Sequence, residues 1–454
     1  MKFYSRLVWI NGKWEKNVEL LINDQGYWAE IKVNQSQASD EAIKLGVVLP
    51  GLTNAHSHAF QRAMAGLSEQ GSPSGDNFWR WRQTMYRLAL AITPSQLETI
   101  ATWLYAELLS QGYTQVCEFH YIHRASNGEP FGDPSDMSWA IVKAAQAVGI
   151  GLTMLPTLYQ YRGFDRQRLQ DDQRRFASSP ESILHIRNAV EEYARKNQCT
   201  NLVNSGVALH SLRAVDAAGI KELISGCNHH PIHIHVSEQI QEVKDCLTHT
   251  GMRPVEWLSK EIGLDHRWNL VHATHTEPQE LIDVAKAKAS VVICPITEAN
   301  LGDGIFDLTA ALNAGLNCSI GTDSHTNRDW SAELRSLEYS LRLTKRARNI
   351  ASDINSNFAP TGHVLFNLAL RGASAASGQP LAGIKIGERA DFFELDTNSG
   401  PLAGLPDEHL IDALVFSSPS SKPKQVFVAG KIVKNDMEKI TQKAIQCMRE
   451  LWQS

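Results

Sequence analysis

Eight short apolar segments, each followed by a stretch with helical periodicity, dominate the middle of this 454-residue chain. Alternating strands and helices build a parallel sheet, because each helix returns the chain to the same end of the sheet. Eight such units are the number that closes the sheet into a (β/α)₈ barrel. The expected strands are Val47–Leu49, Gln115–Glu118, Gly151–Pro156, Val207–His210, Pro231–Val236, Trp268–His272, Val291–Cys294 and Cys318–Thr322.

Short strand patterns separated by turn residues occupy both ends of the chain. They are Phe3–Trp9, Val18–Ile22 and Trp28–Val33 before the barrel, and Ala390–Leu395 and Gln425–Val433 after it. Two β-rich ends around an α/β middle predict a small sheet domain assembled from both termini. We expect an α/β protein with a β-sandwich domain from residues 1–48 and 376–434, a catalytic barrel at 49–375 and a terminal helix at 435–454.

Composition and charge argue for an enzyme that acts on small molecules. The net charge is −5, and the basic residues are scattered, which argues against a nucleic-acid partner. Seven widely spaced cysteines indicate reduced thiols, and neither a signal peptide nor an apolar run of membrane-spanning length is visible. We expect a cytoplasmic protein without membrane contact. We also expect a homodimer, because homodimers are the commonest oligomers among soluble proteins.

A His-x-His pair follows the first expected strand, within Pro50–His58. Side chains at i and i+2 of an extended segment point the same way, so His56 and His58 can share one metal ion. With 17 histidines in the chain, such a pair can also arise by chance.

Three more expected strands end in residues of the same chemical type. His235 and Glu238 follow the fifth strand, His272 the sixth and Asp323 the eighth. Singly, each has an ordinary alternative: a histidine such as His233 or His235 can be a core residue, and an aspartate after a strand is often a helix cap. Jointly they favour a metal site, because barrel enzymes carry their chemistry at these strand ends.

In these positions the chain resembles the amidohydrolase superfamily, specifically its single-metal deaminase branch. The resemblance covers the whole barrel and the split terminal sheet. It implies that His56, His58, His235 and Asp323 bind one divalent ion, most simply zinc, with iron(II), cobalt or manganese as alternatives. Many superfamily members hold a second metal through a carboxylated lysine after the fourth strand, but residues 206–213 contain no lysine.

Longer strings resemble the formiminoglutamate-deiminating group within that superfamily. They are AFQRAM (59–64), ALHSLRAV (208–215), HIHVSEQ (233–239), LVHATHT (270–276), ITEANLGDG (296–304) and IGTDSHT (320–326). The resemblance implies hydrolysis of N-formimino-L-glutamate to N-formyl-L-glutamate and ammonia in histidine degradation. It also implies that the substrate is contacted by Gln61, Arg82, Tyr121, His210 and Arg213. For the first arginine, Arg80 or Arg87 remain alternatives.

The expected reaction gives each polar residue a role. A metal ion makes water nucleophilic near neutral pH, and Asp323 can accept the proton of that water. Glu238 can protonate the substrate nitrogen and the departing ammonia. His272 either orients the water or is a further metal ligand, and the first role is preferred because four ligands already leave a fifth position for water. The planar guanidinium group of arginine can bind a carboxylate through two parallel hydrogen bonds, which suits a substrate with a dicarboxylate tail.

Other functions remain open at this point. The same metal site could serve deamination of a purine or pyrimidine ring, hydrolysis of an amide or ester, or metal binding without catalysis. The roles of five neighbouring polar residues stay open as well: His275, Glu298, Asn300, Ser324 and His325.

Overall fold

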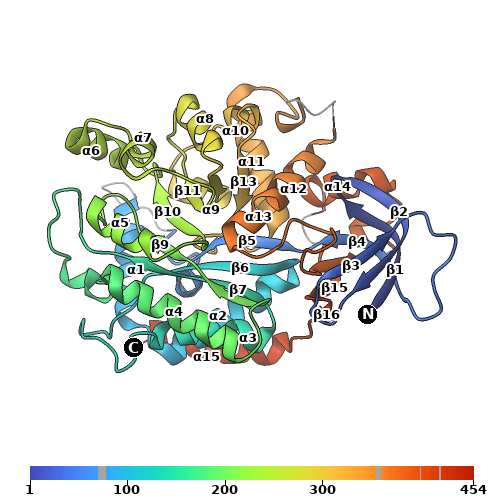
Figure 1. The fold of residues 1–454 in the computed structure, drawn as a ribbon, viewed down its shortest axis with the longest axis horizontal. Coiled ribbons are helices and arrows are strands. Elements are labelled where there is room, and N and C mark those ends of the chain that lie inside the picture. The colour runs from blue at the N-terminus through green and yellow to red at the C-terminus, as the bar shows by residue number, and fades with distance from the viewer. Residues whose placement is uncertain (70–77, 354–358, 399, 419–420, 454) are drawn as a thin grey trace.

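The computed structural model describes residues 1–69, 78–353, 359–398, 400–418 and 421–453. It contains a nearly closed parallel barrel and, at one end of the molecule, a separate mixed sheet built from both termini (Figure 1). The α/β barrel with a terminal sheet domain, expected from the sequence, is therefore confirmed.

Eight parallel strands form the barrel path. They are β5 (Leu52–Ser57), β6 (Tyr113–His120), β7 (Gly151–Leu158), β9 (Val207–Leu209), β10 (Ile232–Val236), β11 (Trp268–His272), β12 (Ser290–Ile293) and β13 (Asn317–Ile320). A short strand, β8 (Val203–Ser205), pairs with β7 beside this path. From β6 onward, each barrel strand overlaps the segment expected from the sequence.

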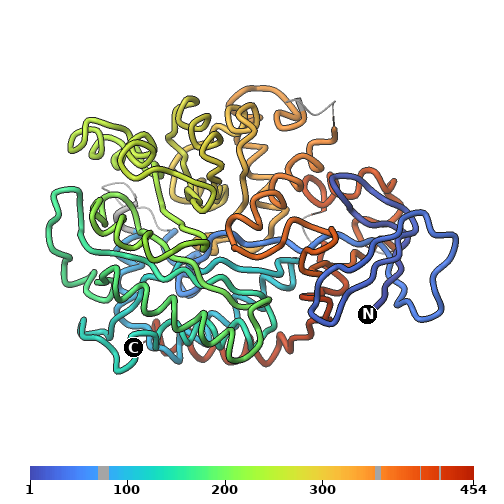
Figure 2. The backbone as a smooth tube through the Cα atoms, viewed as in Figure 1, coloured from blue at the N-terminus to red at the C-terminus, as the bar shows by residue number. Residues whose placement is uncertain are grey.

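The terminal sheet has seven strands on one hydrogen-bonded path. In spatial order they are β16 (Lys431–Ile432), β15 (Pro423–Val428), β14 (Phe392–Leu395), β4 (Ile43–Pro50), β1 (Lys2–Ile10), β2 (Lys13–Ile22) and β3 (Trp28–Lys32). The blue N-terminal and orange-red C-terminal segments run side by side here (Figure 2). Phe3, Phe392 and Phe427 pack in a hydrophobic core of this sheet, with the last two rings stacked at 4.3 Å. The expected β-sandwich is thus a single mixed sheet with its own core.

One strand assignment from the sequence was wrong. Val47–Leu49 was expected to open the barrel, but it lies in β4, which pairs with β1 and β14 in the terminal sheet. The barrel begins with β5, after Gly51. A Cβ at Gly51 would lie 2.4 Å from the Thr114 hydroxyl oxygen, so the chain passes closely between the two sheets there. Both strands are apolar and buried, and hydrophobicity alone therefore could not separate them.

Fifteen α-helices within the described residues connect the strands and cover the barrel. They are α1 (Phe78–Ala91), α2 (Pro94–Ser110), α3 (Asp136–Val148), α4 (Pro180–Lys196), α5 (Ala217–Ser225), α6 (Ile240–Thr250), α7 (Pro254–Trp257), α8 (Pro278–Lys286), α9 (Pro295–Leu301), α10 (Leu308–Asn313), α11 (Trp330–Lys345), α12 (Thr361–Arg371), α13 (Ala373–Ser377), α14 (Leu410–Phe416) and α15 (Met437–Trp452). The expected terminal helix is α15, which begins after its N-cap Asp436 and packs against α2.

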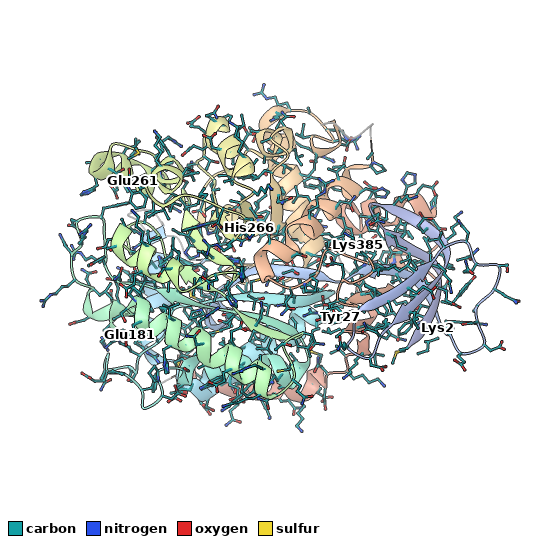
Figure 3. The ribbon with its side chains drawn as sticks, viewed as in Figure 1. Lys2, Tyr27, Glu181, Glu261, His266 and Lys385 are labelled. Carbon is teal, nitrogen blue, oxygen red and sulfur yellow. The ribbon has the colours of Figure 1, made fainter. Side chains whose placement is uncertain are left out.

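The scattered charged residues and the free cysteines agree with the expectations drawn from the composition. Lys2, Glu181 and Glu261 lie far apart at the periphery of the molecule (Figure 3). All seven cysteines are free thiols. Among the described helices, none combines the length and apolar character needed to cross a bilayer.

Candidate active site

The barrel closes at a seam between β5 and the residues that follow β13. The Asp323 amide donates to the His56 carbonyl oxygen at 3.0 Å, and the His58 amide donates to the Asp323 carbonyl oxygen at 3.2 Å. A Cβ at Gly321 would lie 2.6 Å from the His56 Cβ, so the two segments are in close contact. The seam therefore brings together three of the residues that the sequence predicts as metal ligands.

Four ligand atoms converge beside this seam. His56 Nε2 lies 3.1 Å from His58 Nε2 and 3.0 Å from His235 Nε2. The Oδ1 atom of Asp323 lies 3.4 Å from His56 Nε2 and 3.3 Å from His58 Nε2. All four side chains are buried. His56 thus belongs to two groups of possible ligands, one with His58 and Asp323 and one with His235 and His272, and the ligand atoms within each group lie within 4.8 Å of one another.

The outer nitrogens of two histidines fix which ring atoms face inward. His58 Nδ1 lies 2.7 Å from the Phe119 carbonyl oxygen, and His235 Nδ1 lies 2.9 Å from the His210 carbonyl oxygen. Because carbonyls only accept, both Nδ1 atoms carry hydrogen, and in a neutral ring the Nε2 atom is a bare lone pair. Burial lowers the pKa of both rings, which favours the neutral form. Bare nitrogens packed this closely fit a divalent cation between them.

His272 differs from these three histidines. Its Nδ1 lies 3.2 Å from Glu298 Oε1, and its Nε2 lies 3.8 Å from both Glu238 Oε1 and Asp323 Oδ2. Burial alone would lower the pKa of His272, but the surrounding carboxylates raise it to about 10. One nitrogen of His272 also lies within 4.8 Å of ring nitrogens of His56 and His235, so its position fits either a hydrogen-bond donor or a further ligand.

The backbone is strained where these side chains are presented. Ser237, His272, Ala273, Asp323 and His325 all have φ between 47° and 68°, the left-handed region that non-glycine residues rarely adopt. Ser237 follows β10, His272 ends β11 and Ala273 follows it, while Asp323 and His325 lie three and five residues after the end of β13. Such conformations concentrate at functional sites, where the surrounding structure holds them in place.

The adjacent cavity has a cationic end. Arg82 and Arg213 both line it, and each donates to a tyrosine hydroxyl, Tyr86 and Tyr159 respectively. Gln173 Nε2 donates to both hydroxyls, at 3.1 Å and 2.9 Å. Among the described residues lining this cavity, the only carboxylates are Glu238 and Asp323, both beside the histidine cluster, whereas an adjoining cavity that shares the two arginines is also lined by Asp165, Glu242 and Asp245. The cavity is thus divided into an acidic, metal-binding head and a tail of hydrogen-bond donors.

The remaining predicted substrate contacts lie between these ends. Gln61 Nε2 donates to the Tyr121 hydroxyl at 2.9 Å, while Gln61 Oε1 is buried with no hydrogen-bond partner in the described part of the chain. The Tyr121 ring packs edge-on against His58 and His210, with centroids at 5.1 Å and 5.6 Å. All the predicted site residues therefore line the cavity or the histidine cluster.

The three arginine alternatives separate in space. Arg82 lines the cavity, whereas Arg87 packs 4.9 Å over the Trp452 ring of α15 and is not among the lining residues. The side chain of Arg80 lies outside the described residues.

The residues whose roles were left open by the sequence now have contacts. Glu298 holds His272, and His275 Nε2 lies 2.8 Å from the Asp303 carbonyl oxygen. His325 contacts Ser57 and Thr322. Ser324 Oγ lies 3.0 Å from Thr297 Oγ1, and Asn300 Nδ2 donates to Glu69 at an exposed position.

Sequence reasoning did not find Tyr86, Tyr159, Gln173 and Glu118. The first lies in α1, the second directly after β7 and the third in a short 3₁₀ turn before α4. Tyr159 and Glu118 carried a usable signal, because Tyr159 follows the end of a barrel strand and Glu118 is the last residue of the expected strand Gln115–Glu118.

Comparison with known proteins agrees with this geometry. The model of the amidohydrolase family matches residues 47–433. The chain belongs to the amidohydrolase family. Among its relatives, a formimidoylglutamate deiminase from Pseudomonas aeruginosa is 41% identical over 429 residues, which cover 93% of this chain and 92% of the relative. A 5-methylthioadenosine/S-adenosylhomocysteine deaminase from Haloquadratum walsbyi is 24% identical over 418 residues, 90% of this chain and 85% of the relative.

Solved structures place this amidohydrolase among close structural neighbours. The crystal structure of an amidohydrolase from Brucella melitensis shares 37% identity and a TM-score of 0.93, over 99% of both chains. An adenosine deaminase from Xanthomonas campestris, solved with bound zinc, shares the fold with a TM-score of 0.80 at 18% identity, over 100% of this chain and 98% of the other.

Removing one inward-facing nitrogen should weaken metal binding. We expect His58→Ala to lower metal affinity by more than the roughly 10- to 100-fold that loss of an outer contact causes. His275→Ala is the matched control, because His275 lies outside the cluster and should retain wild-type metal content. Metal analysis after dialysis against a chelator measures both variants. Full metal retention by His58→Ala would contradict the ligand assignment.

Proposed function

We propose that this chain hydrolyses N-formimino-L-glutamate to N-formyl-L-glutamate and ammonia, as a step of histidine degradation. The observation that carries the proposal is the division of the cavity: a histidine–aspartate cluster at one end and two arginines at the other. Such a site suits a substrate with an amidine-like head and a dicarboxylate tail. The high identity to a formimidoylglutamate deiminase supports the same substrate.

The proposed cofactor is a single divalent ion, zinc in the first instance and iron(II) as the alternative. His56, His58, His235 and Asp323 would hold it. When bound, the ion supplies Lewis acidity, which makes water a stronger nucleophile at neutral pH. Residues 206–213 offer no lysine for a second ion.

The two oxygens of Asp323 face different neighbours. Oδ1 points to His56 and His58, whereas Oδ2 lies toward His272. In the proposed reaction, the Asp323 carboxylate accepts the proton of the attacking water, and the water oxygen bonds to the formimino carbon. His272, held by Glu298 on its other nitrogen, donates a hydrogen bond that orients the water.

Glu238 delivers the proton that releases ammonia. Burial raises the pKa of Glu238, and the cationic His272 ring opposes that rise. A carboxyl balanced in this way can hold a proton and pass it to the imino nitrogen. The hydroxyl on the former formimino carbon then gives its proton to Glu238, which passes it to the amino group, so that ammonia leaves as the carbon–oxygen double bond forms. The proton taken from water by Asp323 restores the protonated form of Glu238. The Glu242 carboxylate accepts from the amides of Ser237 and Glu238, both at 3.2 Å, and so keeps the backbone of Glu238 in place.

The tail of the substrate would lie against Arg82 and Arg213, with Gln61, Tyr121 and His210 beside its middle. Two fixed guanidinium groups favour two carboxylates over the neutral edge of a purine or pyrimidine ring. We further propose that the enzyme works in the cytoplasm as a homodimer and binds neither nucleic acid nor membrane. Measuring the mass of the protein in solution tests the proposed dimer.

The activity itself is tested by ammonia release from purified protein of known metal content. The substrates are formiminoglutamate, a guanidino analogue, guanine and an adenosine derivative. We expect formiminoglutamate to give the highest kcat/KM, because, unlike the ring substrates, it places carboxylates at both arginines. A preference for a ring substrate, or release of an amino acid in place of ammonia, would refute the proposal.

Glu238→Gln should abolish turnover while preserving the metal. Loss of a proton-transfer group typically lowers the rate by about 100- to 10,000-fold. Glu261→Gln, at an exposed position far from the cavity, is the control and should behave like wild type. Activity that survives in Glu238→Gln would show that the proton is carried by another group.

Arg213→Ala should raise KM for formiminoglutamate. A charge-assisted hydrogen bond contributes about 1.5–3 kcal/mol, so kcat/KM should fall by about 10- to 100-fold. Arg87→Ala removes a guanidinium that lies outside the cavity and should leave KM unchanged. An unaltered KM in Arg213→Ala would rule out its contact with the tail.

A further inference from the structure

Glu118 is a wholly buried carboxylate that does not line the cavity, and the proposed reaction does not use it. It lies near the end of β6 and accepts three hydrogen bonds. Oε1 accepts from the Ala59 amide at 2.6 Å, and Oε2 accepts from the hydroxyls of Ser57 at 2.6 Å and Tyr105 at 2.9 Å. Burying a carboxylate without an ion pair costs folding free energy. We therefore expect Glu118 to have a function that explains its presence.

The contacts of Glu118 surround one predicted metal ligand. Ser57 and Ala59 are the residues before and after His58. Between them, His58 itself donates from Nδ1 to the carbonyl oxygen of Phe119, the residue after Glu118. Two consecutive residues of β6 thus hold three consecutive residues at the end of β5, with the His58 ring fixed in the middle.

A chain of side-chain hydrogen bonds continues from Glu118 across the barrel seam. The Ser57 hydroxyl lies 3.1 Å from His325 Nε2, and His325 Nδ1 lies 2.9 Å from the Thr322 hydroxyl. Thr322 in turn accepts from Asn54 Nδ2 at 2.7 Å. The chain therefore links β5, β6 and the segment after β13, which carries Asp323.

The direction of this chain follows from counting donors. The Thr322 amide donates to Asn54 Oδ1 at 2.9 Å, so the Asn54 amide nitrogen must be the donor to the Thr322 hydroxyl. Thr322 then gives its proton to His325 Nδ1, and the His325 Nε2 hydrogen goes to Ser57. Ser57 has one proton left, which goes to Glu118. Every donor is satisfied only when the chain ends on an acceptor, and that acceptor is the carboxylate.

We propose that Glu118 is a positioning residue for metal binding: as the terminal acceptor of this chain, it holds His58 and the seam beside Asp323 in the geometry that the ion requires. The inference rests on the metal site of the proposed function but not on the identity of the substrate. A glutamine at position 118 would have the same shape as the glutamate. Its NH₂ group, however, would face either the Ala59 amide or the hydroxyls of Ser57 and Tyr105, all of which donate to the carboxylate. The outer contacts of metal ligands typically contribute about 10- to 100-fold to metal affinity.

The test measures zinc affinity of the full chain by competition with a chelator, without substrate. We expect Glu118→Gln to bind zinc about 10- to 100-fold more weakly than wild type. The melting temperature of its metal-free form should stay close to that of the metal-free wild type. Activity lost at limiting zinc should return when zinc is in excess, which a general packing defect would not allow. Wild-type zinc affinity in Glu118→Gln would overturn the proposal.

Two further variants keep the test decisive if Glu118→Gln does not fold. Ser57→Ala cuts the chain between Glu118 and His325, whereas Tyr105→Phe removes a donor that lies outside the chain. We expect Ser57→Ala to weaken zinc binding more than Tyr105→Phe, and equal affinities would overturn the proposal. Because zinc is the only probe, a wild-type chain that binds zinc but does not release ammonia would refute the proposed substrate and leave this inference standing. A wild-type chain that binds neither zinc nor iron(II) would overturn both.

Discussion

The site depends on one backbone contact, the pair of hydrogen bonds between Asp323 and the two residues His56 and His58 across the barrel seam. These residues are more than 260 positions apart in the chain, and no local structure brings them together. Closing the barrel brings their backbones together, and side-chain hydrogen bonds from Asn54 to Thr322 and between Ser57 and His325 cross the same seam. The proposed ion site therefore depends on barrel closure, and the close approach at Gly321 is part of it.

The acidic and the basic side chains of the cavity come from different elements of the fold. The carboxylates Glu238 and Asp323 come from the ends of β10 and β13, beside the imidazoles. The guanidinium groups of Arg82 and Arg213 come from α1 and from the segment after β9. Each donates a hydrogen bond to a tyrosine hydroxyl. Separation of acidic and cationic ends lets one pocket orient a polar substrate, because reversing the substrate would place carboxylate against carboxylate.

Beneath the cavity, a second layer of polar groups supports the first. Phe119 and His210 offer carbonyls to ligand histidines, Glu298 holds His272, and Glu118 ends the chain that crosses the seam. Buried hydrogen bonds of this kind rigidify the groups they touch, whereas the Nδ1 atom of His56 has no hydrogen-bond partner among the described residues. The proposed metal site thus depends on residues that are not themselves proposed as ligands.

The sequence by itself determined the barrel and the terminal sheet, and it predicted which polar residues gather at one rim, because strand periodicity places His56 and His58 on one face and barrel strands end at one rim. It could not separate β4 from β5, since both are apolar and buried, and the barrel strand was placed one segment too early. Tertiary structure alone decided that Arg82 rather than Arg87 lines the cavity. It alone showed that the hydroxyls of Tyr86 and Tyr159 bond to the two arginines and to Gln173, and that Glu118 accepts hydrogen bonds from the residues on either side of His58. These contacts join residues distant in sequence, and such contacts leave no periodic pattern in the chain.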